Sequence, residues 1–506
     1  DGKHTERQAI TMKSIWQLEK RPPIPKPEPL RGSSRTDVAV IGAGMAGILT
    51  AYELKRRGAR VVVFDRGKAG GGVTAGTTAK ITSQHRLIYN RLIAGFGEEK
   101  AAQFAQANQR AIRQYAVLVK AKGIDCAFER RPAFVYARKD AKELEKEAAA
   151  AGRLGIPAAL TDRTELPFSV AGALCFPDQA QFSPLRFLHA LAQELTIYED
   201  TPVWNIEDGA VCFRGGKLRA QAVVIATHFP ILNSPGYYFL RMHQQRSYVV
   251  ALSGAPTLQG MYIDQEEGGF SFREAEGLLL FGGSGHRTGQ NAEGGNYGRL
   301  LRRAGFLYPQ ASVRTMWSTQ DCITADGVPF IGEYAPSMPH VFVACGFNKW
   351  GMTGAMVASS LLADRITGRE NPFAPVFSPR RFPVRASAGQ LMEDGAQSAA
   401  GLTRQALHLP GRTLDSLSPG QGGLVRYNGK KVGAYKDEQG RVYLVSSRCP
   451  HLGCELQWNP EEKTWDCPCH GSRFDFRGRL LDTPARRGPV NRRKAAANGA
   501  VRNKDA

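Results

Sequence analysis

Two short loops near the C-terminal end of the chain carry residues whose types and spacing indicate a metal cluster. Cys449 and His451 are spaced C-x-H, and Cys467 and His470 are spaced C-x-x-H, with fifteen residues between the two pairs. One thiolate and one imidazole from each loop are the ligands of an asymmetric [2Fe–2S] centre. Zinc also binds two cysteines and two histidines, but zinc-finger ligands come as a cysteine pair followed by a histidine pair. The interleaved order therefore favours the iron–sulfur centre.

A second stretch near the N-terminal end has the pattern of a dinucleotide-binding unit. The run Asp37–Ile41 is typical of a short buried strand, and it leads directly into Gly42-Ala43-Gly44-Met45-Ala46-Gly47 and a helical stretch that ends near Gly58. A second apolar run, Val61–Phe64, stops at Asp65. Glycines permit the tight turn and the close approach to a pyrophosphate, the helix N-terminus faces that charge, and an acid after the second strand binds a ribose hydroxyl.

Later segments resemble those of a flavoprotein family. Ala222–Thr227 resembles the second strand and turn that such proteins place near the dinucleotide, with His228 where a glycine is usual. Thr324–Gly332 resembles the T-x-D-G-x-P-x-I-G block of the D-amino-acid-oxidase (glycine/sarcosine oxidase) superfamily. Val341–Phe347 follows as a strand, and Gly351-Met352-Thr353-Gly354 opens a last helix whose N-terminus lies beneath the flavin in that superfamily. The resemblance covers roughly residues 36–375 and implies FAD as the cofactor.

The resemblance also implies which residues contact FAD. They belong to the glycine-rich turn, the end of the second strand, the loop after the first FAD-binding unit, and the N-terminus of the last helix. The predicted FAD-binding residues are Gly42, Gly44, Met45, Ala46, Gly47, Asp65, Arg66, Thr77, Thr78, Ala79, Val203, Ala226, Gly346, Gly351, Met352 and Thr353.

Four residues are candidates for contact with the substrate or the flavin ring. Lys80 and His85 lie in Gly76–His85, which replaces the A-S-x-x-N-G-G type loop of the simple oxidases. Arg273 stands where family members often place an arginine facing a substrate carboxylate, a task that suits a bidentate guanidinium. Trp350 replaces the histidine of the G-F-x-x-H-G pattern. The alternative for each is an ordinary loop, strand or packing role.

The two cluster loops resemble those of a Rieske domain of the subtype that carries an extra cysteine pair. Cys454 and Cys469 occupy equivalent places in the two loops, so a disulfide could join them beside the cluster. Ser472 keeps the serine of the C-H-G-S-x-Y pattern, whereas Phe474 stands at the tyrosine position. The resemblance also implies that Pro484 belongs to a loop that covers the cluster.

The length of 506 residues predicts two or three domains. The fold class expected is an α/β FAD-binding Rossmann-like domain with an inserted mixed or antiparallel-sheet substrate domain (α+β), followed by a small all-β Rieske domain. The predicted parts are a Pro-rich arm (1–35), the FAD-dependent oxidoreductase domain (36–380, with discontinuous FAD-binding and substrate subdomains), a linker rich in Ala, Ser and Gly (381–405), the Rieske domain (406–490) and a basic flexible tail (491–506).

Composition excludes several other classes of protein. The formal net charge is +21, but no aromatic-rich basic module accompanies it, so nucleic acid is not an expected partner. No window approaches the ~18 uninterrupted apolar residues of a membrane span, and the polar N-terminal stretch has no apolar segment of a secretory signal. The chain begins at Asp1 without a methionine, so a removed presequence stays open. The five cysteines outside the loops are scattered, which favours a reducing compartment such as the cytoplasm.

Two redox groups on one chain predict coupled electron transfer. A flavin accepts two electrons as a hydride, whereas a Rieske cluster passes electrons singly. The chain is therefore expected to oxidise a small amine or amino-acid-like substrate and to exchange electrons through the cluster with an external carrier of the ferredoxin, cytochrome or quinone type. One alternative is a cluster that admits electrons for a reductive or oxygen-using reaction. Another is a flavin oxidase with a structural cluster. No paired-His-plus-carboxylate segment predicts the catalytic iron of a Rieske oxygenase.

Overall fold

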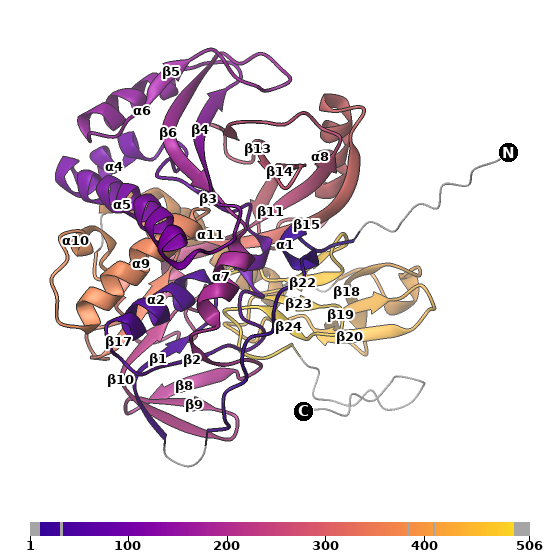
Figure 1. Cartoon of the computed structure of the whole chain (residues 1–506). Coiled ribbons are helices and arrows are strands. Elements are labelled where there is room, and N and C mark those ends of the chain that lie inside the picture. Colours follow the sequence, from indigo (N-terminus) through magenta and orange to yellow (C-terminus); the bar gives the residue numbers. More distant parts are fainter. Residues whose placement is uncertain (1–10, 31–33, 382–383, 408–409, 490–506) are drawn as a thin grey trace. The chain divides into compact units, whose positions relative to one another are not determined.

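The computed structural model describes residues 11–30, 34–381, 384–407 and 410–489 (Figure 1). Its residues form two compact units. The first unit comprises Asp1–Gly236, Ser247–Gly285 and Tyr297–Ser387, and the second comprises Tyr237–Arg246, His286–Asn296 and Ala388–Ala506. The predicted basic tail, 491–506, lies outside the described residues.

The first sheet of the first unit is built around the strand that precedes the glycine-rich turn. Strand β1 lies between β10 and β2 and is parallel to both, with Val40 opposite Val224 and Val63. The strand order is β16-β17-β10-β1-β2-β7, and a β8–β9 hairpin joins β10. The predicted Rossmann-like unit is thereby confirmed. The strands are β1 (Ser34–Ile41), β2 (Val61–Phe64), β7 (Thr196–Tyr198), β8 (Val203–Glu207), β9 (Ala210–Phe213), β10 (Gly216–Ile225), β16 (Phe330–Glu333) and β17 (Val341–Cys345).

Two helices that begin at glycine-rich turns pack against each other in the core of this unit. Helix α2 (Met45–Arg56) and helix α9 (Gly351–Ile366) are buried over most of their length and lie in contact. Burial of apolar surface of this kind contributes about 25 cal/mol per Å². The other helices before residue 380 are α1 (Ile15–Leu18), α3 (Val73–Gly76), α4 (Tyr89–Phe96), α5 (Glu98–Lys122), α6 (Lys142–Arg153), α7 (Pro184–Ala192), η1 (Tyr238–Leu240), α8 (Asn296–Leu307) and α10 (Ala374–Phe377).

The second sheet is mixed, as the sequence predicts for the substrate domain. Its order is β15-β11-β14-β13-β12-β4-β6-β3, with β5 paired to β6. Strand β12 runs parallel to β4 and antiparallel to β13. The strands are β3 (Lys80–Ile81), β4 (Glu129–Ala137), β5 (Ala159–Thr161), β6 (Gly172–Gln181), β11 (Met242–Ser253), β12 (Met261–Asp264), β13 (Ser271–Ala275), β14 (Leu278–Arg287) and β15 (Ser312–Thr324).

The described part of the Pro-rich arm, residues 11–30, contacts the rest of the first unit. Ser14 caps helix α1, and Trp16, in that helix, is 1% exposed. Tyr198 donates through its hydroxyl to the carbonyl oxygen of Glu28 at 2.7 Å. The described arm therefore contacts the first unit through helix α1 and through residues 20–30, which have no regular secondary structure.

The prediction of a linker at 381–405 is wrong. Val384–Leu407 form helix α11, because the Ala, Leu, Met, Gln and Arg residues among its glycines have favourable helix propensity. Arg381 belongs to the first unit, where its guanidinium pairs with the carboxylate of Asp326 at 2.8 and 3.0 Å. The content of Ala, Ser and Gly therefore led to the prediction of a linker where the chain forms a helix.

The β part of the second unit contains two small antiparallel sheets. The first has the order β18-β19-β20, and Asn428 and Gly429 both have positive φ in the turn between β18 and β19, as a type I′ hairpin requires. The second has the order β21-β22-β23-β24 and surrounds a core that includes Leu456, Trp465 and Phe474. The elements are η2 (Leu414–Ser416), β18 (Gly422–Tyr427), β19 (Lys430–Lys436), β20 (Val442–Ser446), β21 (Gln457–Asn459), β22 (Thr464–Asp466), β23 (Arg473–Asp475) and β24 (Leu480–Asp482).

No helix within the described ranges is long and apolar enough to cross a membrane.

Candidate functional sites

The turn between β1 and α2 has the geometry of a pyrophosphate cradle. Gly42 has φ +107°, and a Cβ there would lie 2.4 Å from the carbonyl oxygen of Ala226. A Cβ on Gly47 would lie 1.8 Å from the carbonyl oxygen of Gly42. Both positions therefore require glycine. The backbone N–H of Met45, the first residue of α2, donates to Thr74 Oγ1 at 3.1 Å.

Asp65 lies directly after β2 and is bound to the same turn. Its carboxylate accepts the backbone N–H of Ala43 at 2.7 Å and that of Gly67 at 2.8 Å. Burial raises the pKa of Asp65, and these two N–H donors oppose that shift. A carboxylate has lone pairs left after two such bonds, so the predicted ribose contact is compatible with the structure and stays a prediction. The same holds for Arg66 and for Val203 at the start of β8.

The loop predicted to lie at the flavin ring is held by two indole groups through its backbone carbonyls. Trp16 Nε1 donates to the carbonyl oxygen of Thr77 at 2.7 Å. Trp317 Nε1 donates to the carbonyl oxygen of Gly76 at 2.9 Å. Because residues from the arm and from β15 fix this loop, its conformation depends on chain segments far away in the sequence.

Arg273 also holds this loop and is almost fully buried, with 2% exposure. Its Nε donates to Gln181 Oε1 at 2.9 Å, and one terminal nitrogen donates to the carbonyl oxygen of Phe182 at 3.1 Å. The other terminal nitrogen donates to the carbonyl oxygen of Thr78. All three nitrogens are therefore engaged with the protein. The structure gives Arg273 a positioning role, and its predicted contact with a substrate carboxylate stays a prediction.

Lys80 lies beside this arginine at the start of β3. Its Nζ contacts Thr78 Oγ1 at 3.2 Å. Burial, with a further contribution from the charge of Arg273, lowers the pKa of Lys80 to about 7. An amine with that pKa is present in both protonation states at neutral pH, which suits proton transfer. Its contact with flavin or substrate stays a prediction.

Two predicted site residues that lie far apart in the sequence meet in the structure. The rings of His85 and Trp350 are stacked, with centroids 4.8 Å apart and planes 9° apart. His85 Nε2 lies 2.9 Å from the carbonyl oxygen of Thr82, which also accepts the hydroxyl of Thr353 in the first turn of α9 at 2.7 Å. Burial lowers the pKa of His85 to about 3, so its imidazole is neutral at pH 7.

The residues next to this stack, Arg86 and Lys349, were missed by the sequence analysis. Arg86 has φ +62°, and its Nε is buried without a hydrogen-bond partner. Lys349 Nζ contacts Ser247 Oγ at 3.2 Å. Burial lowers the pKa of both cations. At Lys349 the charges of Asp321 and Glu267 oppose this shift while Arg86 adds to it, and at Arg86 the charges of Glu267, Asp264 and Glu266 oppose it. The sequence shows a basic residue beside each predicted aromatic residue, but it does not show that the two cations lie in electrostatic range of each other.

The four predicted cluster ligands come together in the second unit. The thiols of Cys449 and Cys467 are buried and in contact, and this contact lowers the pKa of Cys467 while raising that of Cys449. The rings of His451 and His470 have centroids 4.9 Å apart. Nδ1 of His470 is buried without a hydrogen-bond partner. Two adjacent thiols and two adjacent imidazoles fit the ligand set of a [2Fe–2S] cluster.

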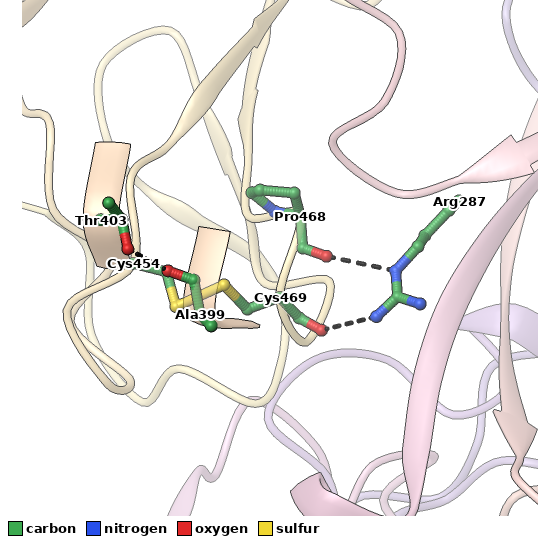
Figure 2. Close-up of a disulfide and its surroundings, with 6 residues drawn as sticks. All are labelled: Arg287, Ala399, Thr403, Cys454, Pro468 and Cys469. Atoms are coloured by element: carbon green, nitrogen blue, oxygen red, sulfur yellow. Dashed lines mark hydrogen bonds between the residues drawn. A yellow bond between two sulfur atoms is a disulfide. The ribbon is translucent and has the colours of Figure 1, made fainter. Parts of the chain in front are cut away.

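The expected disulfide is confirmed. Cys454 and Cys469 are bonded, with Cα atoms 6.7 Å apart, and Figure 2 shows the bond next to helix α11. Gly401 of that helix approaches closely, since a Cβ there would lie 2.7 Å from Cys469 Sγ. The backbone N–H of Glu455 donates to the carbonyl oxygen of Gly401 at 3.3 Å. The segment expected to be a linker therefore packs on the disulfide.

Ser472 and Phe474, at the serine and tyrosine positions of the C-H-G-S-x-Y pattern, lie close to these ligands. The hydroxyl of Ser472 accepts the backbone N–H of Ala485 at 2.9 Å, which joins the loop after Pro484 to the second cluster loop. The same hydroxyl is hydrogen-bonded to the sulfur of Cys449 and opposes the rise in its pKa that Cys467 and burial cause. Phe474 is fully buried in the core that contains the cluster cysteines.

Two side chains from outside the predicted Rieske boundary, 406–490, bind the second cluster loop. Gln244 Nε2 donates to the carbonyl oxygens of His470 at 2.7 Å and of Thr483 at 2.8 Å. Arg287 donates to the carbonyl oxygens of Pro468 and Cys469, each at 3.3 Å (Figure 2). The predicted boundary is thus too narrow. No feature of the sequence indicates that the start of β11 and the end of β14 belong to the second unit.

An aromatic side chain from the same region contacts both histidine ligands. The ring of Phe239 stands edge-to-face against His451 and His470, with centroid distances of 5.6 and 5.5 Å. Phe239 lies in η1, within the segment Tyr237–Arg246 of the second unit. A phenyl ring at this place covers the two imidazoles with apolar surface.

Comparison with known proteins identifies the family. Residues 37–365 match the model of the FAD dependent oxidoreductase family, and residues 412–493 match that of the Rieske [2Fe-2S] domain. The first match covers more than half of the chain. The chain belongs to the FAD-dependent oxidoreductase family.

Similar proteins agree with this family assignment. The flavoenzyme is 37% identical over 481 residues to a Bacillus subtilis (strain 168) protein named Rieske 2Fe-2S iron-sulfur protein YhfW, covering 91% of this chain and 94% of that protein. It is 25% identical over 366 residues to the glycine oxidase of Geobacillus kaustophilus (strain HTA426), covering 67% of this chain and 95% of that enzyme. The crystal structure of the Geobacillus kaustophilus glycine oxidase superposes with a TM-score of 0.60 at 24% identity, covering 69% of this chain and all of the other.

The cofactors follow from the two matched domains. The flavoenzyme is an oxidoreductase that takes FAD in its first domain and a [2Fe–2S] cluster in its Rieske domain. Two structural features fit these groups. One is the glycine cradle at Gly42, and the other is the buried Nδ1 atom of His470, which has no hydrogen-bond partner.

Proposed function

We propose that this flavoenzyme oxidises a small amino acid or related amine by hydride transfer to FAD. The observation that carries the proposal is the pair Arg86 and Lys349 beside the stacked rings of His85 and Trp350. Burial costs both cations hydration, and the nearby carboxylates, such as Glu267 and Asp321, offset that cost only in part, so a further anion would be favourable. A guanidinium and an ammonium together suit a substrate carboxylate.

The residues of the first unit support the handling of such a substrate. FAD, when bound, supplies the two-electron acceptor. Trp350 and the neutral ring of His85 offer an apolar wall, and Arg86 and Lys349 offer the positive charge that would orient a carboxylate. Lys80, with a pKa of about 7, is the group in the flavin loop suited to accept a proton from a substrate ammonium.

We further propose that the electrons leave singly through the Rieske cluster to an external carrier of the ferredoxin, cytochrome or quinone type. A protein that holds a two-electron group and a one-electron group on one chain is suited to convert between these two modes. The cysteines outside the cluster loops, among the described residues, are free thiols, which supports a cytoplasmic location.

An anaerobic titration tests the substrate part of this proposal. Purified holoprotein is mixed with amino acids and with the matching amines that lack the carboxylate, while flavin and cluster absorbance are followed together. Bleaching of the flavin by amino acids at concentrations at least tenfold lower than by the amines is expected. Equal responses to both series would contradict the role of the cation pair.

An aerobic assay separates the electron-transfer part from the alternatives. Fast reduction of one-electron dyes with little peroxide is expected. Peroxide formed in a one-to-one ratio with oxidised substrate would instead identify a flavin oxidase with a structural cluster. Flavin reduction only by a reduced carrier, and by no amine, would identify the cluster as an electron entry point.

A further inference from the structure

A buried ion pair lies against the second cluster loop and has no role in the function proposed above. Arg287 NH1 lies 2.5 Å from Asp394 Oδ1, and the two side chains are 7% and 10% exposed. Arg287 stands at the end of β14 and Asp394 in helix α11. Both belong to the second unit, although neither lies in the stretch that matches the Rieske domain.

The arginine of this pair also binds the loop that carries two of the cluster ligands. Its Nε and NH2 donate to the carbonyl oxygens of Pro468 and Cys469, the two residues between Cys467 and His470 (Figure 2). The turn after β14 lies against the same loop, since a Cβ on Gly289 would be 2.6 Å from the backbone nitrogen of Pro468. The guanidinium therefore binds the two residues that adjoin the ligands Cys467 and His470 in the sequence.

The carboxylate of the pair has further polar neighbours. Gln390 Nε2 donates to Asp394 Oδ1 at 3.0 Å, and His243 Nδ1 lies 3.3 Å from the same oxygen. Burial acts to raise the pKa of Asp394, but His243 and Arg287 together lower it, so Asp394 carries a negative charge at neutral pH. The cluster loop thus has one fixed positive charge directly bonded to it and one fixed negative charge behind that.

We propose that Arg287 and Asp394 are positioning residues that set the reduction potential of the [2Fe–2S] cluster through opposed charges. Reduction adds one electron and therefore one negative charge to the cluster, and no other bond has to form or break. A guanidinium bonded to the ligand loop stabilises that added charge, whereas the carboxylate behind it opposes it. In a low-dielectric interior neither charge is fully screened.

The sign of each effect follows from this arrangement. Arg287→Gln keeps a hydrogen-bond donor for the loop but removes the positive charge, so the cluster becomes harder to reduce and its midpoint potential falls. Asp394→Asn keeps the shape but removes the negative charge, so the midpoint rises. We expect each single substitution to change the equilibrium constant for reduction about tenfold, which is 59 mV for one electron. The double variant should return close to the original midpoint.

A redox titration of the full-length holoprotein, followed through the electron paramagnetic resonance signal of the reduced cluster, tests this proposal. It needs no substrate, so its outcome does not depend on the function proposed above. The matched control is Arg441→Gln, which removes an arginine paired with Asp437 on an exposed hairpin of the same unit and should leave the midpoint unchanged. Arg287→Lys keeps the positive charge, so its midpoint potential should stay close to that of the unchanged protein.

Purely structural roles give a different pattern. If the pair only holds the loop, both single variants lose iron and labile sulfide or broaden the signal, and the double variant does not recover. That result would overturn the proposal, as would midpoints that shift in the same direction in both single variants. If a variant fails to fold, Arg287→Lys paired with Asp394→Glu supplies a milder cycle in which unchanged midpoints are expected, and a shift in either would contradict charge control.

Discussion

Two buried arginines hold functional loops in this protein, and they differ in how their charge is balanced. Arg273 binds three acceptors around the flavin loop, and within the described residues no carboxylate lies within ion-pair distance of it. Arg287 binds two carbonyls of the second cluster loop and is paired with Asp394 at 2.5 Å. The charge of Arg273 is offset only from a distance, by Glu274, Glu129 and Glu276, whereas the charge of Arg287 is paired directly with a carboxylate.

This difference suits the chemistry of the two groups. A flavin that accepts a hydride gains negative charge, and a cation without a direct carboxylate partner would favour the reduced form if the loop lies at the flavin ring as predicted. A cluster that passes one electron on must give it up again, so a compensated charge keeps its potential within reach of its partners. The two regions thus use the same side chain with different electrostatic results.

The largest expected effect is loss of the cluster without loss of FAD. His470→Ala removes a cluster ligand, so the Rieske signal in electron paramagnetic resonance should be lost while FAD stays bound, because the first unit has its own core. Iron, labile sulfide and flavin are measured on the same sample, with Arg441→Gln as the control variant. A variant that loses flavin together with iron would show that the two regions are not independent.

Substitution of Arg273 is expected to give the next largest effect. Arg273→Met keeps an unbranched side chain but removes the charge and three hydrogen bonds of a charged group, each worth about 1.5–3 kcal/mol. We expect FAD to dissociate at least tenfold more readily, measured as the flavin retained after dialysis. The exposed Arg153→Gln, which breaks a surface pair with Glu98, is the control. Full retention of FAD in Arg273→Met would contradict the positioning role.

A smaller and more selective effect is expected at the cation pair. Arg86→Gln should raise KM for an amino acid substrate roughly tenfold to a hundredfold, because one charged hydrogen bond is worth about 1.5–3 kcal/mol. The KM for the matching amine should stay the same, and kcat should change little. If FAD is lost instead, the pair serves the cofactor and not the substrate.

The pH dependence gives the smallest effect and tests Lys80. Only the neutral amine accepts a proton, and the pKa of Lys80 is lowered to about 7. The kcat/KM for a protonated amine substrate should therefore fall about tenfold per pH unit below pH 7 and level off above it. Lys80→Gln should remove this limb of the profile. An unchanged profile in that variant would assign proton transfer to another group.

The four cluster ligands could be predicted from the sequence because all of them lie within one short stretch. C-x-H and C-x-x-H spacings indicate the ligands locally, whereas the equivalent places of Cys454 and Cys469 left open whether the two are bonded. The glycine cradle was predictable for the same reason, since strand, turn and helix are consecutive. The positions of Gly42 and Gly47 in the structure require glycine, as the fingerprint implies.

The residues around these sites could not be predicted because they depend on non-local contacts. Trp350 and His85 stack although they lie far apart in the sequence, and no sequence pattern indicates that contact. Arg273 has the residue type expected for a substrate contact, but burial gives it three partners in the protein. Gln244 and Arg287 lie near the ends of strands, and the sequence of a strand does not show which loop its end contacts.

The linker prediction failed for a physical reason of the same kind. Alanine and glycine together indicate either flexibility or close packing, and only the partner decides. Gly401 permits helix α11 to approach the disulfide, where any larger side chain would collide with Cys469 Sγ. The same composition therefore builds a packed helix in this protein.

The central claim is that electrons taken from a substrate by the flavin reach the Rieske cluster of the same chain. The most direct test is anaerobic mixing of the holoprotein with the amino acid that bleaches its flavin, followed by freezing and electron paramagnetic resonance at successive times. The account predicts that the signal of the reduced cluster appears as the flavin is reduced and is absent in His470→Ala. A fully reduced flavin beside a cluster that stays oxidised, in a sample whose cluster dithionite can reduce, would contradict it.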